Sequence, residues 1–273
     1  MPQVTTEADR DLQETCGLSS QLSSDIEQQQ RYVEEIRKAR LTGMHEFQSW
    51  FNESSDINQT IVRGYWDFSI HILTRKVCEL IRNPEQKTAL EIGYGGGRLT
   101  NAACGYFKEV IGIDIHDEQE TVREFLRSQG RINFRLIKTS GSTIDIESES
   151  THFIYSFIVL QHLPSFEAFL CYLQESYRTL KPGGVAQLYF GKYSKLDPVE
   201  RLRYFIQGYK EIPDAPVNQT SLVMRSSKVE ELSEKIGFRV VDAGTSYKNV
   251  PDGYPKVKGG QSYVTLLKRD KCS

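Results

Sequence analysis

The fold of this chain is decided by the stretch Leu90-Glu91-Ile92-Gly93-Tyr94-Gly95-Gly96-Gly97-Arg98-Leu99. The apolar run Thr88–Ile92 predicts a strand that leads straight into the glycines, and Arg98–Tyr106 predicts the helix that follows them. Glycine permits a tight turn and lets backbone N–H groups approach a ligand without an intervening Cβ, and the start of a helix offers further unpaired N–H groups. The stretch therefore predicts a loop that binds a nucleotide or a nucleoside.

The second predicted strand, Val110–Asp114, ends in an acid. Asp114 lies 21 residues after Gly93, where a carboxylate can accept hydrogen bonds from both hydroxyls of a ribose. A dinucleotide-binding loop of the G-x-G-x-x-G type needs a glycine at its sixth position, which here is Arg98. Together these features favour a nucleoside cofactor over a dinucleotide.

Short apolar runs alternate with amphipathic helices beyond this junction. The predicted strands are Thr88–Ile92, Val110–Asp114, Asn133–Lys138, Phe153–Ile158 and Val185–Phe190, and the helices between them are Arg98–Tyr106, Glu118–Ser128 and Phe166–Leu180. Continuous apolar strands are typical of a parallel sheet covered by helices on both faces, which predicts a doubly wound α/β domain. The last two strands, Phe238–Asp242 and Tyr263–Leu267, are joined by a long loop without a helix, so we expect the final strand to be antiparallel.

The composition divides the chain into three parts. Residues 1–24 are rich in Thr, Ser, Gln and Glu and are expected to be flexible, whereas residues 25–84 are expected to form a helical cap. Residues 85–273 are expected to form the ligand-binding domain, with an insertion at 191–226. The cap should hold two helices, one carrying Val33, Ile36, Met44, Phe47 and Trp50 and the other Trp66, Ile70, Leu73, Val77, Leu80 and Ile81. In the insertion and after it, Pro198 should open a helix to about Gly208, and a capping box Ser227–Glu230 should open a helix that Gly237 ends.

Charge and cysteine content exclude several classes of partner. The 273 residues carry 34 Lys and Arg against 36 Asp and Glu without a long basic stretch, so neither a nucleic acid nor an anionic membrane is expected as a partner. No apolar run of about 18 residues and no signal peptide is visible, so we expect a cytoplasmic protein, monomeric or homodimeric. The five cysteines form no C-x-x-C pair, so neither a metal site nor a disulfide framework is expected.

Three motifs in order resemble those of class I S-adenosylmethionine-dependent methyltransferases. Glu91–Leu99 resembles the first motif of that superfamily, Ser156-Phe-Ile-Val-Leu-Gln-His-Leu-Pro164 its fourth-strand segment, and Arg178-Thr-Leu-Lys-Pro-Gly-Gly184 the turn into its fifth strand. The resemblance implies S-adenosylmethionine as the cofactor. It also implies a seven-stranded sheet in the order 3-2-1-4-5-7-6, with the last strand antiparallel.

The same resemblance implies a set of cofactor-binding residues. The loop residues would wrap the methionine part, Glu91 would support the loop or reach the amino group through water, Asp114 would hold the ribose, and Ile115 would pack on the adenine. After the third strand the family usually places an acid near the adenine, and here that position is Ser140, so Ser142 or backbone atoms would have to hold the base. The implied set is Glu91, Gly93, Tyr94, Gly95, Gly97, Asp114, Ile115, Gly141, Ser142, Ser156 and Phe157.

Methyl transfer from a sulfonium depends mostly on placing the acceptor in line with the leaving sulfur. A hydroxyl acceptor also benefits from a general base, and His162, which follows the fourth strand at the ligand-binding edge of the sheet, is the leading candidate. The alternative is that His162 only caps the next helix or lines the cofactor pocket.

The acceptor should be selected outside the common core, where we expect the insertion at 191–226 to lie on the acceptor side. No D/N-P-P-Y/F tetrapeptide follows the fourth strand, which argues against methylation of nucleobase or glutamine amino groups. Aromatic residues that could wall an acceptor pocket are Trp50, Phe51, Tyr65, Trp66, Tyr189, Tyr193, Tyr204, Phe205 and Tyr209. They favour a small, partly apolar acceptor, with O-methylation slightly preferred. Three alternatives stay open: methylation of protein or RNA, a binding or scaffold subunit with this fold but no activity, and a nicotinamide-dependent oxidoreductase.

Overall fold

A computed structural model describes residues 7–52, 56–141, 143–192, 198–246 and 260–269, and side chains from residue 25 onward. Its centre is a seven-stranded sheet in the order β3-β2-β1-β4-β5-β9-β8, in which β9 runs antiparallel to the other six strands. Numbered within this sheet, the order is 3-2-1-4-5-7-6, which confirms the predicted fold. The strands are β1 Thr88–Ile92, β2 Glu109–Asp114, β3 Phe134–Lys138, β4 Thr151–Ser156, β5 Leu180–Phe190, β8 Phe238–Thr245 and β9 Ser262–Lys268.

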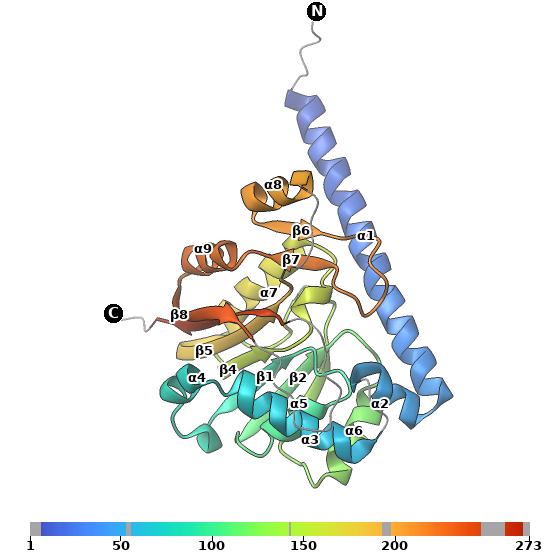
Figure 1. The fold of residues 1–273 in the computed structure, drawn as a ribbon, viewed down its shortest axis with the longest axis vertical. Helices are drawn as coiled ribbons and strands as arrows, with labels where there is room; N and C mark the ends of the chain where they lie inside the picture. The colour runs from blue at the N-terminus through green and yellow to red at the C-terminus, as the bar shows by residue number, and fades with distance from the viewer. Residues whose placement is uncertain (1–6, 53–55, 142, 193–197, 247–259, 270–273) are drawn as a thin grey trace, which may run out of the picture.

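Helices cover both faces of this sheet because its strands are apolar on both sides (Figure 1). Consecutive β1 residues enter different cores: Leu90 packs in the cluster that includes Phe169 and Val229, and Ala89 in the cluster with Val77 and Ala102. The helices of the sheet domain are α5 Arg98–Ala103, α6 Gln119–Ser128, α7 Phe166–Thr179 and α9 Ser226–Ile236, with 3-10 turns at Pro84–Gln86 and Leu160–His162.

The cap contains more helices than the sequence predicts. Its elements are α1 Glu7–Thr42, α2 Met44–Asn52, α3 Ile57–Asp67, the π-helical turn Phe68–Ile72, and α4 Arg75–Leu80. The first predicted helix is interrupted at Gly43. The second is interrupted before Thr74, whose hydroxyl accepts a hydrogen bond from the Val77 backbone N–H and begins a new helix. α1 begins at Glu7 rather than near Asp25, and the flexibility of residues 1–24 stays a prediction.

α1 crosses the edge of the sheet where the parallel strands end. The Ser165 hydroxyl, at the start of α7, donates to Asp25 at 2.6 Å, and the Arg40 guanidinium donates to Thr121, in α6, at 2.8 Å. Figure 1 shows the helix running along one side of the sheet domain between these two contacts. α1 is thereby placed over the edge at which open α/β folds bind their ligands.

The insertion folds into the predicted helix and into a small second sheet that the sequence did not predict. α8 spans Pro198–Gln207, and β6 Tyr209–Glu211 pairs antiparallel with β7 Leu222–Met224. Three-residue strands are too short to produce a recognisable alternation. The capping box is also wrong: α9 begins at Ser226 with Arg225 as its cap, without a side-chain hydrogen bond, although Gly237 ends the helix as predicted.

No helix within the described part of the chain is long and apolar enough to cross a membrane.

Candidate active site

The glycine loop lies between β1 and α5, at the carboxyl end of the sheet. Gly93, Gly95 and Gly97 all have positive φ, at 78°, 50° and 84°. A Cβ at Gly93 would lie 2.3 Å from Val159, and one at Gly95 would lie 2.8 Å from the Phe51 ring. The loop therefore needs glycine both for its backbone conformation and for its close packing against neighbouring elements.

Asp114 holds this loop against β2. One carboxylate oxygen accepts a hydrogen bond from the Gly95 N–H at 2.8 Å, and the other accepts from the Ile115 N–H at 2.7 Å. A carboxylate offers about four acceptor positions, so two remain after these bonds. Asp114 lines the cavity described below and can present those positions to the two hydroxyls of a ribose.

The buried His116 contacts the glycine loop at Gly95, a contact that the sequence did not predict. Its Nδ1 accepts from the Glu118 N–H at 3.1 Å, so Nε2 is the nitrogen that can donate, and it lies 3.2 Å from the Gly95 carbonyl oxygen. The ring is fully buried beside Phe51 and Tyr94. The only signal in the sequence is its position two residues after Asp114.

Glu91 is a buried acid beneath the loop. The Thr100 and Tyr155 hydroxyls donate to its Oε2 at 2.6 and 2.9 Å. Burial raises the pKa of Glu91 to about 7, against the lowering effect of these hydrogen bonds and of the nearby Arg98 charge. A cationic group bound in the cavity would favour the ionised form, as expected for a residue that faces an amino group.

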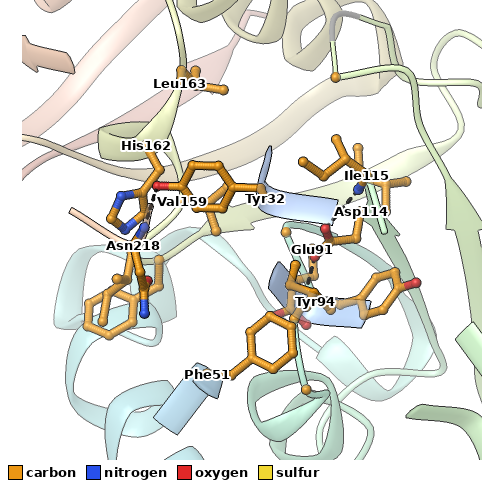
Figure 2. A pocket seen from close by; sticks show the side chains of 18 of the residues that line it. Tyr32, Phe51, Glu91, Tyr94, Asp114, Ile115, Val159, His162, Leu163 and Asn218 are labelled. Atoms are coloured by element: carbon orange, nitrogen blue, oxygen red, sulfur yellow. Dashed lines mark hydrogen bonds between the residues drawn. The ribbon is translucent and has the colours of Figure 1, made fainter. Parts of the chain in front are cut away.

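The loop, the cap and the segment after β4 enclose a cavity. The volume of this cavity that water molecules can reach, measured at their centres, is about 170 Å³. Figure 2 shows Tyr32 near its centre, with His162 and Asn218 on one side of the ring and Asp114 and Ile115 on the other. The lining also includes Gln28, Gln29, Ile36, Trp50, Phe51, Glu91, Gly93, Tyr94, Gly95, Gly96, Arg98, Leu99, Ile113, Gly141, Phe157, Ile158, Val159, Leu163, Pro164 and Tyr172.

Most, but not all, of the residues proposed from the sequence line this cavity. Those that do are Glu91, Gly93, Tyr94, Gly95, Asp114, Ile115, Gly141, Phe157 and His162. Gly97 instead caps α5, where a Cβ would meet Val122, and Ser156 is fully buried and donates to the Ile92 carbonyl oxygen at 3.1 Å. Ser142 lies outside the described residues.

His162 has a defined proton arrangement. Its Nδ1 lies 2.7 Å from the Gln219 carbonyl oxygen and must carry the proton, because a carbonyl only accepts. Its Nε2 lies 3.1 Å from the side-chain nitrogen of Gln161. The side-chain oxygen of Gln161 accepts a hydrogen bond from the Gln261 amide at 2.9 Å, which orients the Gln161 nitrogen toward His162. Burial lowers the pKa of His162, more than its hydrogen bond to Gln219 raises it, so the ring is neutral at pH 7 with its lone pair on Nε2.

Two residues that the sequence did not single out, Tyr32 of the cap and Asn218 of the insertion, close the cavity on this side. The Asn218 backbone N–H donates to the Tyr32 hydroxyl at 2.9 Å, and its side-chain amide donates to the Trp50 carbonyl oxygen at 3.3 Å. The Tyr32 ring lies 6.0 Å from the imidazole of His162. Asn218 and Ile158 both have positive φ, which is uncommon for non-glycine residues and strained for a β-branched one.

Arg98 ties the cap to the glycine loop. Its guanidinium donates at 2.6 Å to the fully buried Asp67 of α3, which also accepts from Arg63. A Cβ at Gly64 would lie 2.4 Å from the Arg98 carbonyl oxygen, so α3 and α5 are in close contact. From the sequence, Arg98 mattered only as the residue that replaces the sixth glycine of a dinucleotide loop.

The aromatic residues proposed for an acceptor wall divide into two groups. Trp50 and Phe51 line the cavity, and Tyr193 lies outside the described residues. Tyr189 lies outside the cavity and contributes to the fold, because its hydroxyl donates to the His71 carbonyl oxygen at 2.6 Å. Tyr65, Trp66, Tyr204, Phe205 and Tyr209 likewise do not line the cavity.

These features fit an adenosyl cofactor with a charged amino-acid end. The glycine loop is a cradle that Cβ atoms would disrupt, Asp114 is placed for a ribose, and Glu91 is a buried acid for an ammonium group. Within the described residues, no group of three or more His, Cys, Asp and Glu side chains could hold a metal ion.

Comparison with known proteins agrees with this fit. A family model described as a methyltransferase domain matches residues 90–188. Among solved structures, the chain is similar to an S-adenosylmethionine-dependent methyltransferase from Clostridium acetobutylicum, at 16% identity and a TM-score of 0.56, covering 81% of this chain and 99% of that one. A second, from Methanosarcina mazei, gives 18% identity and a TM-score of 0.55, covering 72% and 99%.

The same fold also serves other chemistry. The 4+2 cyclase SpnF matches at 13% identity and a TM-score of 0.55, covering 75% of this chain and 83% of that one. At such identities the structural likeness shows the fold alone. No curated protein matches the chain significantly.

Proposed function

We propose that this chain is a class I S-adenosylmethionine-dependent methyltransferase that methylates a small, uncharged, partly apolar molecule, with a hydroxyl slightly preferred over an amine as the acceptor. The observation that carries the proposal is the chemistry of one side of the cavity, which we name the acceptor chamber: Tyr32, Trp50, Ile158, His162 and Asn218. Two of its residues, His162 and Asn218, lie on the opposite side of the Tyr32 ring from Asp114 and Ile115, which are assigned to the nucleoside (Figure 2).

The acceptor chamber offers no charge to an ionic acceptor. The charged residues in the described cavity lining are Glu91, Asp114 and Arg98. Asp114 and Glu91 hold the glycine loop and its surroundings, and Arg98 is paired with the buried Asp67. His162 is neutral at pH 7 because burial lowers its pKa. An acceptor with a carboxylate or an ammonium group would enter this chamber without a counter-charge, which is unfavourable.

The residues would divide the work as follows. S-adenosylmethionine supplies an electrophilic methyl group when it is bound. Gly93 and Gly95 would leave room for its amino-acid end, Asp114 would hold the ribose, and Glu91 would hold the ammonium group. The walls of the acceptor chamber would orient the acceptor oxygen and exclude water, since alignment supplies much of the rate in such a displacement.

His162 is the proposed base for a hydroxyl acceptor. The lone pair on Nε2 suits this role, and donation from Nδ1 to Gln219 keeps the ring oriented. The Gln161 amide occupies that lone pair, so an acceptor hydroxyl would have to replace this hydrogen bond. If His162 does not take the proton, it lines the pocket instead, which is one of the alternatives left open by the sequence.

An acceptor screen tests the proposal. The purified chain is incubated with methyl-labelled S-adenosylmethionine and matched sets of neutral alcohols and phenols, amines, carboxylates, protein and RNA. We expect label in neutral small molecules, chiefly on oxygen. Label confined to protein, RNA or charged acceptors would contradict the proposal, whereas cofactor binding without any transfer would favour a binding or scaffold subunit.

The division into a flexible segment 1–24, a cap 25–84 and a catalytic domain 85–273 with an acceptor-side insertion is part of this proposal. So are a cytoplasmic location and a monomeric or homodimeric state.

A further inference from the structure

We propose that Gln29, on the cap helix α1, binds the adenine ring of the cofactor through its side-chain amide. The proposal rests on the cofactor assignment made above. It assigns recognition of the adenine base to the cap rather than to the sheet domain.

The position of the base follows from the ribose site. Asp114 ends β2, and β3 is its parallel neighbour, with Asp114 in register with Lys138. A nucleoside whose ribose bonds to Asp114 extends its base past the ends of these two strands. Ile115 and Gly141 line the cavity there, so the base must lie between the segments that follow β2 and β3.

Of the described polar side chains directly after β3, Thr139 and Ser140 are engaged elsewhere. The exposed Ser140 hydroxyl lies 3.2 Å from the Thr143 hydroxyl. The Thr139 hydroxyl donates to the Thr143 carbonyl oxygen and accepts from the Gly141 N–H. The acids in the described lining, Glu91 and Asp114, belong to the glycine-loop side. Within the described segment between β3 and β4, Gly141 is the residue that lines the cavity, and the acids Asp145 and Glu147 do not, so this segment offers the base no acidic partner there.

Gln29 reaches this position from the opposite side. A Cβ on Gly141 would lie 2.4 Å from its amide nitrogen and 2.9 Å from its amide oxygen, so the amide lies directly on the Gly141 backbone, where only glycine leaves space for it. Gln29 is half-buried and lines the cavity. Its neighbour Gln28 instead donates to the His162 carbonyl oxygen at 3.4 Å.

A glutamine amide suits adenine chemically. The base presents an amino donor beside a ring-nitrogen acceptor, and a glutamine side chain can accept from the first and donate to the second at once. Neither hydrogen bond requires a charge. Gln29 can thus replace the acid that Ser140 does not supply, and cofactor binding then depends on α1 being docked.

A double-mutant cycle on affinity tests this without activity. Calorimetry measures binding of S-adenosylhomocysteine and of its purine analogue, which lacks the 6-amino group, to the parent and to Gln29→Met. In the parent, loss of the 6-amino group should weaken binding about tenfold. In Gln29→Met, the adenosyl compound should already bind about tenfold more weakly, and removal of the amino group should then have no further effect.

Two further variants complete the test. Gln30→Met, at an exposed position on the same helix, should bind both compounds as the parent does. Gln29→Glu keeps an acceptor for the amino group and should retain discrimination between the two compounds, even if Gln29→Met fails to fold. Equal discrimination by Gln29→Met and the parent would overturn the assignment of Gln29. Failure of the folded parent to bind S-adenosylhomocysteine would instead overturn the cofactor assignment.

Discussion

Single residues at the carboxyl edge of the sheet determine how the site responds to pH. Glu91 and His162 are both buried enough for desolvation to move their pKa values, in opposite directions because one is an acid and the other a base. Glu91 tends to keep its proton near neutrality, whereas His162 tends to lose its proton. The two residues therefore give separate pH signatures, one in stability and one in turnover.

Glu91→Gln should stabilise the cofactor-free protein at pH 8 but not at pH 4. The pKa of Glu91 is about 7 in the folded chain against an ordinary 4.5, so the folded state holds the proton to higher pH. The free energy of unfolding of the parent should therefore fall as the pH rises from about 4.5 to about 7, and the glutamine variant should lack this decline. Urea unfolding at several pH values measures the difference.

The same variant should bind S-adenosylhomocysteine more weakly, because the amide cannot offer a negative charge to the ammonium group. Glu85→Gln, at an exposed position, is the matched control and should change neither quantity. If Glu91→Gln leaves affinity at the parental value, Glu91 supports the loop only.

His162→Ala should lower turnover on a hydroxyl acceptor about 10²–10⁴-fold with little change in cofactor affinity. In the parent, turnover should rise with pH through a limb below 6.5, because burial lowers the pKa of His162, and should be flat above it. Gln161→Leu removes a hydrogen bond that the neutral ring accepts, so the limb should move to higher pH. Profiles of turnover against pH for the parent, His162→Ala and Gln161→Leu measure these changes. Near-parental turnover of His162→Ala would show that His162 is not the base.

At the scale of elements, the cap helices shape the glycine loop through side-chain contact. Phe51 of α2 lies against Gly95, and the buried Gln48 of the same helix donates to the Gly96 carbonyl oxygen at 3.3 Å. Tyr32 of α1 and Asn218 of the insertion close the cavity on the acceptor side. The cap is therefore part of the binding site as well as a cover for it.

Gly95→Ala should greatly weaken binding of S-adenosylhomocysteine, because its methyl group would lie 2.8 Å from the Phe51 ring and force the loop or α2 to move. Gly130→Ala is a matched control: Gly130 also has positive φ, at 73°, but a Cβ there meets nothing within 4 Å. Both variants carry similar backbone strain, so calorimetry on the pair isolates the effect of the contact. Similar losses of affinity in both would show that backbone strain alone is responsible.

For the whole molecule, one buried carboxylate joins the cap to the sheet domain. Asp67 accepts hydrogen bonds from Arg63 of its own helix and from Arg98 at the start of α5. The carboxylate is fully buried, and both guanidinium groups are largely buried. The attraction between Asp67 and the two guanidinium groups is therefore screened less by water than the attraction within a surface ion pair.

Asp67→Ala should lower the free energy of unfolding by about 3–5 kcal/mol, because it leaves two largely buried guanidinium groups unpaired. Glu79→Ala removes a surface partner of Arg75 and should cost less than about 1 kcal/mol. Urea denaturation of the two variants compares them directly. A loss for Asp67→Ala as small as for Glu79→Ala would mean that the cap is held by apolar packing alone.

The sequence by itself determined the sheet and the nucleoside side of the cavity. The local periodicity of apolar residues predicts the strands and the helices between them. Gly93, Gly95 and Asp114 are recognisable because a tight strand–helix turn and an acid at the end of a strand are local features of the sequence. Motifs that are contiguous in the chain remain contiguous in the fold, so the residues read from them mostly line the cavity.

Only the tertiary structure decided the cap and the acceptor side. Gln29, Tyr32, His162 and Asn218 meet in one cavity although the chain separates Gln29 from Asn218 by 189 residues, and no local pattern encodes that proximity. It depends on α1 crossing the strand ends and on the insertion loop reaching back to it. The physical reason is that periodicity reports which face of an element is buried, whereas the partner of that face is chosen by packing and hydrogen bonding across the whole molecule.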